Sequence, residues 1–159
     1  MIEHPFEPVF NPDSKILILG SFPSVMSREK EFYYGHPQNR FWRVLGLIFG
    51  VDAPIGNDGK KQFLLDKEIA LWDVIRSCDI TGSGDLSIKN AVYNDINVVL
   101  KNSSVQKIFT NGTAAHSFYK KMSKALYLPE AVLLPSTSPA NASYSLSRLT
   151  EKWEIIIRD

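Results

Sequence analysis

The sequence predicts an α/β protein with a three-layer α/β/α sandwich, in which helices cover both faces of a central, mostly parallel four-stranded sheet. Four short apolar runs, each bounded by turn residues, predict buried strands at residues 15–19, 69–72, 106–109 and 131–134. Between and after these runs, apolar residues recur at helical spacing. Alternating strands and helices are typical of parallel sheets, whose crossover connections are right-handed.

Each predicted helix carries an apolar stripe. The helix at residues 40–49 places Phe41, Val44, Leu45, Ile48 and Phe49 on one face. Asn39, directly before it, is a residue type that caps helix N-termini. Similar patterns predict helices at residues 93–100 and 114–122 and a last helix that carries Leu146, Leu149, Trp153 and Ile156. Residues 56–61 and 81–84 are predicted to be loops.

Length and composition favour one compact domain over residues 1–159. A chain of this size buries roughly two thirds of the surface exposed when it is unfolded, so it needs neither a metal nor a disulfide. The single cysteine, Cys78, excludes an internal disulfide and a cysteine-based zinc site. We find no signal-peptide pattern and no apolar run long enough to span a membrane, which predicts a soluble cytoplasmic protein.

Charge is nearly balanced, at +1 for the whole chain. Residues 101–159 hold eight basic and four acidic residues, or +4, whereas residues 1–100 hold ten basic and thirteen acidic residues, or −3. This asymmetry is compatible with a basic face for nucleic acid, but an ordinary solvated surface often gives such a split as well.

Polar or small residues follow each predicted strand. They are residues 20–24, Asp73, residues 110–113 and residues 135–141. Because parallel strands end at the same edge of a sheet, these four segments should converge there, where ligands bind in such folds. Residues 20–24 lack the glycine spacings of nucleotide-cofactor sites, so no cofactor is expected.

Residues 32–42 gather aromatic, histidine, amide and arginine side chains between a strand and a helix, as a functional site does. Phe41 and Trp42 are assigned to the core. Tyr33 and Tyr34 suit either stacking on a flat ring or plain aromatic packing. Elsewhere, Asp73 suits either a ligand contact or a local cap. His116 is expected to be structural, and His4 to be exposed.

Four segments together resemble the uracil-DNA glycosylase superfamily, most closely its hypoxanthine-DNA glycosylase branch. They are ILILGSFPS at residues 16–24, YYGHPQNRFW at 33–42, IALWDVIRSC at 69–78 and LPSTSPANA at 134–142. The resemblance covers the chain almost end to end. It implies an enzyme that flips a deaminated base out of DNA and cuts its N-glycosidic bond.

The resemblance also implies roles for particular residues. Phe22 stands where uracil enzymes carry a catalytic Asp or Asn, so Asn39 is expected to supply the catalytic amide instead. The base pocket is expected to comprise Tyr34 as the stacking ring, Asp73 as the reader of the base edge, and His36, Gly20, Ser21 and Phe22. DNA contacts are expected from Ser136, Thr137, Ser138 and Asn141, with Leu134 in place of the uracil enzymes' histidine and small Ala140 in place of a bulky wedge.

The expected function is therefore a monofunctional DNA glycosylase that favours hypoxanthine and leaves an abasic site, without a metal or cofactor. Its partner would be DNA containing deaminated bases, and it would act as a monomer in the cytoplasm, at the nucleoid. Two alternatives stay open at this point. One is a uracil or mismatch-specific glycosylase, and the other is a catalytically silent domain that binds damaged DNA.

Overall fold

The computed structural model describes residues 1–158 and contains a four-stranded parallel sheet. Its strands are β2 (Ile16–Gly20), β3 (Ile69–Asp73), β6 (Lys107–Asn111) and β7 (Ala131–Leu134). Their order across the sheet is β3-β2-β6-β7, and every pair in it is parallel. All four strands lie within a few residues of the predicted positions.

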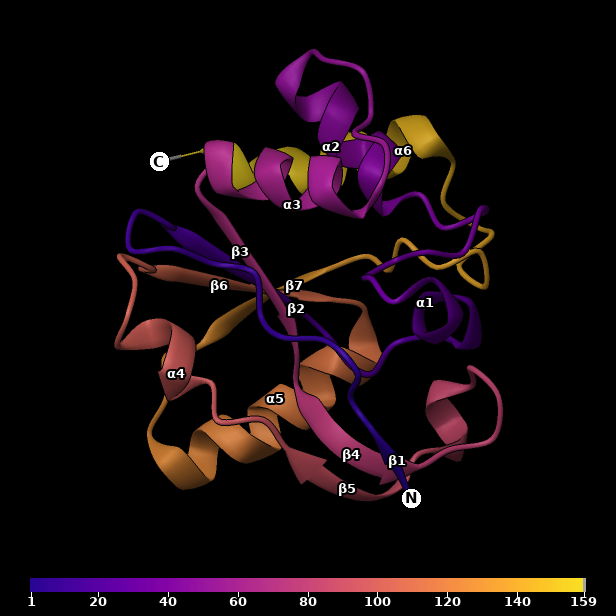
Figure 1. The fold of residues 1–159 in the computed structure, drawn as a ribbon, viewed down its shortest axis with the longest axis vertical. Coiled ribbons are helices and arrows are strands. Elements are labelled where there is room, and N and C mark those ends of the chain that lie inside the picture. Colours follow the sequence, from indigo (N-terminus) through magenta and orange to yellow (C-terminus); the bar gives the residue numbers. More distant parts are fainter. Residues whose placement is uncertain (159) are drawn as a thin grey trace.

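Helices cover both faces of this sheet (Figure 1). On one side lie α2 (Phe41–Phe49), α3 (Asn57–Asp66) and α6 (Leu146–Trp153), which continues into a short 3-10 helix at Glu154–Ile157. On the other side lie α4 (Asn97–Leu100) and α5 (Thr113–Leu126). The predicted three-layer α/β/α sandwich is confirmed.

Burial explains why the strands read as continuous apolar runs. Leu17 and Ile18 on β2 point to opposite faces of the sheet, as neighbours on a strand do, and both are fully buried. The same holds for Ala70 and Leu71 on β3. A strand covered on both faces loses the alternation of polar and apolar residues that marks a one-sided sheet.

A second, antiparallel sheet was not predicted. It consists of β1 (Ile2–Glu3), β4 (Ile75–Asp79) and β5 (Lys89–Tyr93), in the order β1-β4-β5. β4 begins only two residues after the end of β3, so one continuous stretch of chain serves both sheets. β1 has only two residues and β5 is largely solvent-exposed, and neither carries the apolar run that identifies a buried strand.

Two predicted elements are wrong. Residues 93–100 do not form one helix, because Tyr93 ends β5 and only Asn97–Leu100 is helical. Residues 56–61 are not a loop, because α3 starts at Asn57. Its first turns are polar and exposed, and Leu64 is the one residue in α3 that is buried, so the helix lacks a clear apolar stripe in sequence.

The first residues of the chain run along the outer edge of β3. The backbones of Val9 and Leu71 exchange two hydrogen bonds of 2.9 Å, which pairs the otherwise free strand edge. Further toward the N-terminus, the amide of His4 donates to the carbonyl of Arg76 at 2.6 Å. This route carries His4 past the end of β3. Within residues 1–158, no helix is both long and apolar enough to cross a membrane.

We predict that Leu17→Ala and Ile18→Ala each lower the free energy of unfolding by about 2–5 kcal/mol, because both side chains are fully buried on opposite faces. Val132→Ala on edge strand β7, where the residue is 44% exposed, serves as the control and should cost no more than about 1 kcal/mol. Urea denaturation measures all three. A near-neutral result for either β2 variant would contradict a sheet covered on both faces.

Candidate active site

A cavity of about 450 Å³ opens at the carboxyl ends of the parallel strands. Its walls come from the loop after β2, the segment before α2, the end of β3, the loop after β4, the end of β6 and the loop after β7. Every sequence-predicted site residue except Asn141 lines it: Gly20, Ser21, Phe22, Tyr34, His36, Asn39, Asp73, Ser136, Thr137 and Ser138. The volume falls in the range of ordinary small-molecule sites.

The ends of β2 and β3 determine the floor of this cavity. Gly20 and Asp73 are register partners, so the Asp73 carboxylate lies beside the Gly20 backbone. A Cβ on Gly20 would overlap Asp73 Oδ1 and lie 2.8 Å from Tyr34 Oη. Glycine is therefore required here for close approach, since any side chain would displace the two polar atoms that border the cavity.

Asp73 is buried, and it pairs with a residue that the sequence did not implicate. His4 Nε2 lies 2.8 Å from Asp73 Oδ2, and the two side chains are only 2% and 5% exposed. The expectation that His4 is exposed is wrong, because the N-terminal segment that pairs with β3 carries the imidazole inward. Asp73 thus meets the requirement that a buried carboxylate has a hydrogen-bonded partner.

Tyr34 has three unusual properties at once. Its ring stacks on Phe41, with centroids 4.1 Å apart and planes 25° from parallel, and Tyr34 also lines the cavity. Its backbone is left-handed at φ 53°, a strained conformation for a tyrosine. Its hydroxyl is buried without a hydrogen-bond partner among the described residues. Burial raises the pKa of this phenol, the Asp73 charge raises it further and the nearby Asn111 side chain opposes both, so the hydroxyl stays protonated.

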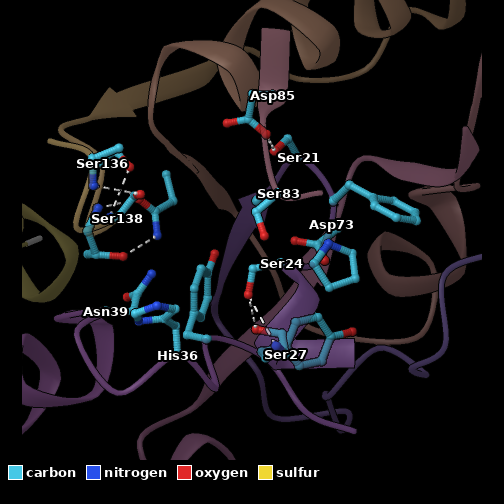
Figure 2. Close-up of a pocket in the computed structure, with 18 of the residues that line it drawn as sticks. Ser21, Ser24, Ser27, His36, Asn39, Asp73, Ser83, Asp85, Ser136 and Ser138 are labelled. Atoms are coloured by element: carbon cyan, nitrogen blue, oxygen red, sulfur yellow. Dashed lines mark hydrogen bonds between the residues drawn. The ribbon is translucent and has the colours of Figure 1, made fainter. Parts of the chain in front are cut away.

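Asn39 lies one residue before the helix cap. Arg40 is the N-cap of α2, and Asn39 Oδ1 accepts a hydrogen bond of 2.9 Å from the Phe41 amide. This bond fixes the side-chain orientation and leaves Nδ2 as a donor. Beside it, His36 Nδ1 lies 3.0 Å from the Gln38 amide and accepts from it, so the proton of the neutral ring is on Nε2. Figure 2 shows Asn39 and His36 on one side of the cavity and Asp73 on the other.

The loop after β7 is held by side-chain amides. Asn111 Oδ1 accepts from the Thr137 amide and its Nδ2 donates to Thr137 Oγ1, both at 3.0 Å. Asn141 Nδ2 donates to the Ser136 carbonyl at 3.0 Å. Thr137 is fully buried, so these contacts anchor the loop to the interior of the protein. Ser136 and Ser138, by contrast, are only partly buried and lie on the cavity side of the loop (Figure 2).

Arg40 ties this loop to the start of α2. Its guanidinium donates to the carbonyls of Ser138 at 3.1 Å, Asn141 at 3.0 Å and Tyr144, while its amide donates to the Thr137 carbonyl at 3.1 Å. A planar guanidinium can satisfy several carbonyls simultaneously in fixed directions. Arg40 is therefore committed to holding the loop in place, which leaves it unavailable as a phosphate contact.

Sequence reasoning also missed Asp85, which follows the glycine-rich loop after β4. Its Oδ1 accepts from Ser21 Oγ at 2.7 Å (Figure 2). The residue as a whole is exposed, yet its carboxyl faces the cavity, and burial there raises its pKa. The hydrogen bond from Ser21 opposes this change and the Asp73 charge adds to it.

In residues 1–158, no three His, Cys, Asp or Glu side chains gather closely enough to hold a metal ion.

Comparison with known proteins identifies the family to which this fold belongs. Residues 7–158 match the family model of the uracil DNA glycosylase superfamily. A hypoxanthine DNA glycosylase from Methanosarcina acetivorans is 34% identical over 160 residues, which covers 99% of each chain. One of the same name from Methanosarcina barkeri is 34% identical over 144 residues, or 90% of each chain.

A solved structure supports the same family assignment. The solution NMR structure of a Methanosarcina acetivorans protein assigned by name to the uracil DNA glycosylases superposes with a TM-score of 0.82 at 34% identity, covering 98% of this chain and 96% of that one. The chain belongs to the uracil DNA glycosylase superfamily. The sequence-based predictions of this superfamily and of a DNA glycosylase, a hydrolase of N-glycosyl bonds, are confirmed.

We predict that Arg40→Lys loosens the loop after β7, because a lysine retains the charge but cannot reach three carbonyls. Hydrogen exchange of the Asn141 and Tyr144 amides, which close turns in this loop, should accelerate at least about tenfold, corresponding to about 1.5–3 kcal/mol of lost charged hydrogen bonds. Arg43→Lys, on an exposed position of the same helix, is the matched control. Equal exchange in both variants would refute this role of Arg40.

Proposed function

We propose that this protein hydrolyses the N-glycosidic bond of hypoxanthine flipped out of DNA and leaves an abasic site. The observation that carries this proposal is the buried carboxylate of Asp73 at one wall of a cavity whose opposite wall presents the amide of Asn39. The names of the two Methanosarcina relatives favour the same base. The cavity volume suits a purine.

Base extrusion comes first. Flipping a base out of a duplex costs a few kcal/mol, and the cost is lowest for a mispaired base such as hypoxanthine opposite thymine. We assign Tyr34 as the ring on which the flipped base stacks, because Tyr34 lines the cavity while Phe41 supports one face of its ring. Ser136 and Ser138, on the partly buried side of the loop after β7, are assigned to the DNA backbone.

Recognition of the base edge follows from the chemistry of a carboxylate. Asp73 in its ionised form accepts hydrogen bonds and cannot donate them. Hypoxanthine presents N1–H to such an acceptor, whereas adenine presents a lone pair at N1. A buried polar group left unpaired by the wrong substrate discriminates strongly between close analogues. Asp73 therefore selects the deaminated purine against the normal base from which it arises.

Bond cleavage develops positive charge on the deoxyribose and negative charge on the departing base. Donors fixed in advance lower the barrier to such a step. Asn39 Nδ2 is held in one orientation by the bond from the Phe41 amide to Oδ1, and we assign it to the attacking water or the departing base. The residues that line the cavity, all within the described part of the chain, include no lysine, which favours simple hydrolysis over a lyase reaction.

We predict that Asn39→Ala and Asn39→Asp both reduce hypoxanthine release by about 10²–10³-fold, the usual effect of losing one such donor. The aspartate is the matched control for local structure, because it keeps an oxygen to accept from the Phe41 amide and loses only the donor. Matched duplexes with one deoxyinosine, deoxyuridine or deoxyxanthosine, scored for alkali-labile sites, measure release. Preferential uracil release would indicate a uracil glycosylase, and lesion binding without release a silent binder.

Tyr34→Leu should slow release by roughly 5–150-fold, because base–aromatic stacking contributes about 1–3 kcal/mol. Tyr34→Phe keeps the ring and removes only the unpaired hydroxyl, so it should stay within about threefold of wild type and be at least as stable. Single-turnover kinetics on deoxyinosine duplex measure both. The stacking assignment fails if the leucine and phenylalanine variants are equally active.

A monomeric state and a cytoplasmic location at the nucleoid also belong to this proposal. The site is assembled within one chain, and the substrate is chromosomal DNA. Light scattering on the protein with and without duplex tests the first point, and imaging of a tagged protein tests the second.

A further inference from the structure

We propose that His4 is a positioning residue for base selection: it occupies Oδ2 of Asp73 with a hydrogen bond and so leaves Oδ1 as an acceptor that cannot carry a hydrogen. This inference rests on the proposed function and adds a residue to it. His4 does not line the cavity, so it would act on the base only through Asp73.

The geometry holds the imidazole in one place. His4 Nε2 is 2.8 Å from Asp73 Oδ2, and Nδ1 lies 2.9 Å from the Phe6 carbonyl and 3.2 Å from the Phe6 amide. Phe6 and Phe22 meet the ring nearly edge-on, with centroids at 5.3 and 6.0 Å, and Tyr33 lies at 5.8 Å. Three aromatic rings and hydrogen bonds at both nitrogens therefore hold the imidazole in its observed orientation.

The contact at 2.8 Å requires a hydrogen between Nε2 and Oδ2, because two lone pairs at that distance repel each other. This hydrogen belongs either to Nε2 or to Oδ2. In both arrangements Oδ1 carries no hydrogen and can only accept. The direction of the hydrogen bond between Asp73 and a base is therefore set by His4 and does not depend on which of the two atoms holds the proton.

Oδ1 is the oxygen that remains for a ligand. It lies against the Gly20 backbone, at the position that a Cβ on Gly20 would overlap, and both residues line the cavity. Without His4, no partner would hold a hydrogen at Oδ2, so a hydrogen on the carboxyl would be free to lie on Oδ1. Asp73 would then donate where it should accept, and it would match adenine N1 in place of hypoxanthine N1–H.

Other titratable groups act on Asp73 from different elements. They are the phenols of Tyr33 and Tyr34 and the carboxyl of Asp85. Burial raises the pKa of both phenols above their ordinary value, so they stay neutral across the assay range. Burial also raises the pKa of the Asp85 carboxyl, and the variant Asp85→Asn, which keeps an acceptor for Ser21, separates its contribution from that of Asp73.

The first test is kinetic and compares His4→Phe with His4→Gln. The phenylalanine keeps the aromatic packing and removes the hydrogen bond, and it should lower hypoxanthine release at pH 7 by about 10–100-fold, the usual effect of losing a charged hydrogen bond. The glutamine, with an amide donor, should restore part of the activity at pH 7.

Measurements on the Asp85→Asn background should leave this difference unchanged. Activity of His4→Phe equal to wild type, or activity of His4→Gln no higher than that of His4→Phe, would overturn the proposal and leave His4 as a purely structural residue. If wild type itself releases no hypoxanthine, the proposed function fails, and the question of His4 is then decided by the second test.

The second test does not use activity. Nitrogen-15 spectra of the imidazoles, with His4 assigned from its absence in His4→Phe, should show that Asp73→Asn moves the His4 Nε2 resonance and leaves those of His36 and His116 unchanged. A His4 resonance that does not respond to Asp73→Asn would show that the pair does not exist in solution, and the proposal would be wrong whatever the base specificity.

Discussion

The close approach of the Gly20 backbone to the Asp73 side chain is the constraint on which the site depends. It arises from the parallel register of β2 and β3, which ends both strands side by side with no side chain on the glycine. Because that space is open, Asp73 Oδ1 and Tyr34 Oη can border the same cavity. The surrounding loops add the amide of Asn39 and the hydroxyls of Ser136 and Ser138. The floor of the cavity, however, is formed by the ends of β2 and β3.

Several residues around the cavity have features that lower the stability of the fold. Tyr34 holds a left-handed backbone and an unpaired buried hydroxyl, and Asp73 is a buried carboxyl supported by one imidazole. Strain and buried polar groups persist where the surrounding structure determines them and where function requires them. Here the support comes from a sheet buried on both faces and from Arg40, which connects the start of α2 to four carbonyls of the loop after β7. Rigid elements thereby hold a site whose own residues do not stabilise the fold.

The sequence was sufficient to predict the parallel sheet, because strands buried on both faces are continuous apolar runs whose ends are marked by turn residues. It was also sufficient to gather most of the site, since loops that follow parallel strands meet at one edge. It could not show that His4 is buried, because a histidine three residues from the start has no local signal, and its position depends on the pairing of Val9 with Leu71. Asp85 was missed for a similar reason: only the tertiary contact with Ser21 distinguishes it from any acid in a glycine-rich loop. α3 escaped detection because its buried face is a single leucine.

We propose that Asp73 holds a flipped hypoxanthine by accepting a hydrogen bond from its N1–H. A crystal structure of the protein on a duplex with one 2′-fluorinated deoxyinosine, whose glycosidic bond resists cleavage because the fluorine disfavours positive charge on the sugar, tests it most directly. We expect the base in the cavity, stacked on Tyr34, with N1 about 2.7–3.2 Å from Asp73 Oδ1 and Asn39 Nδ2 facing the sugar or the base. A base that enters the cavity with another edge toward Asp73, or that binds elsewhere on the protein, would contradict the claim.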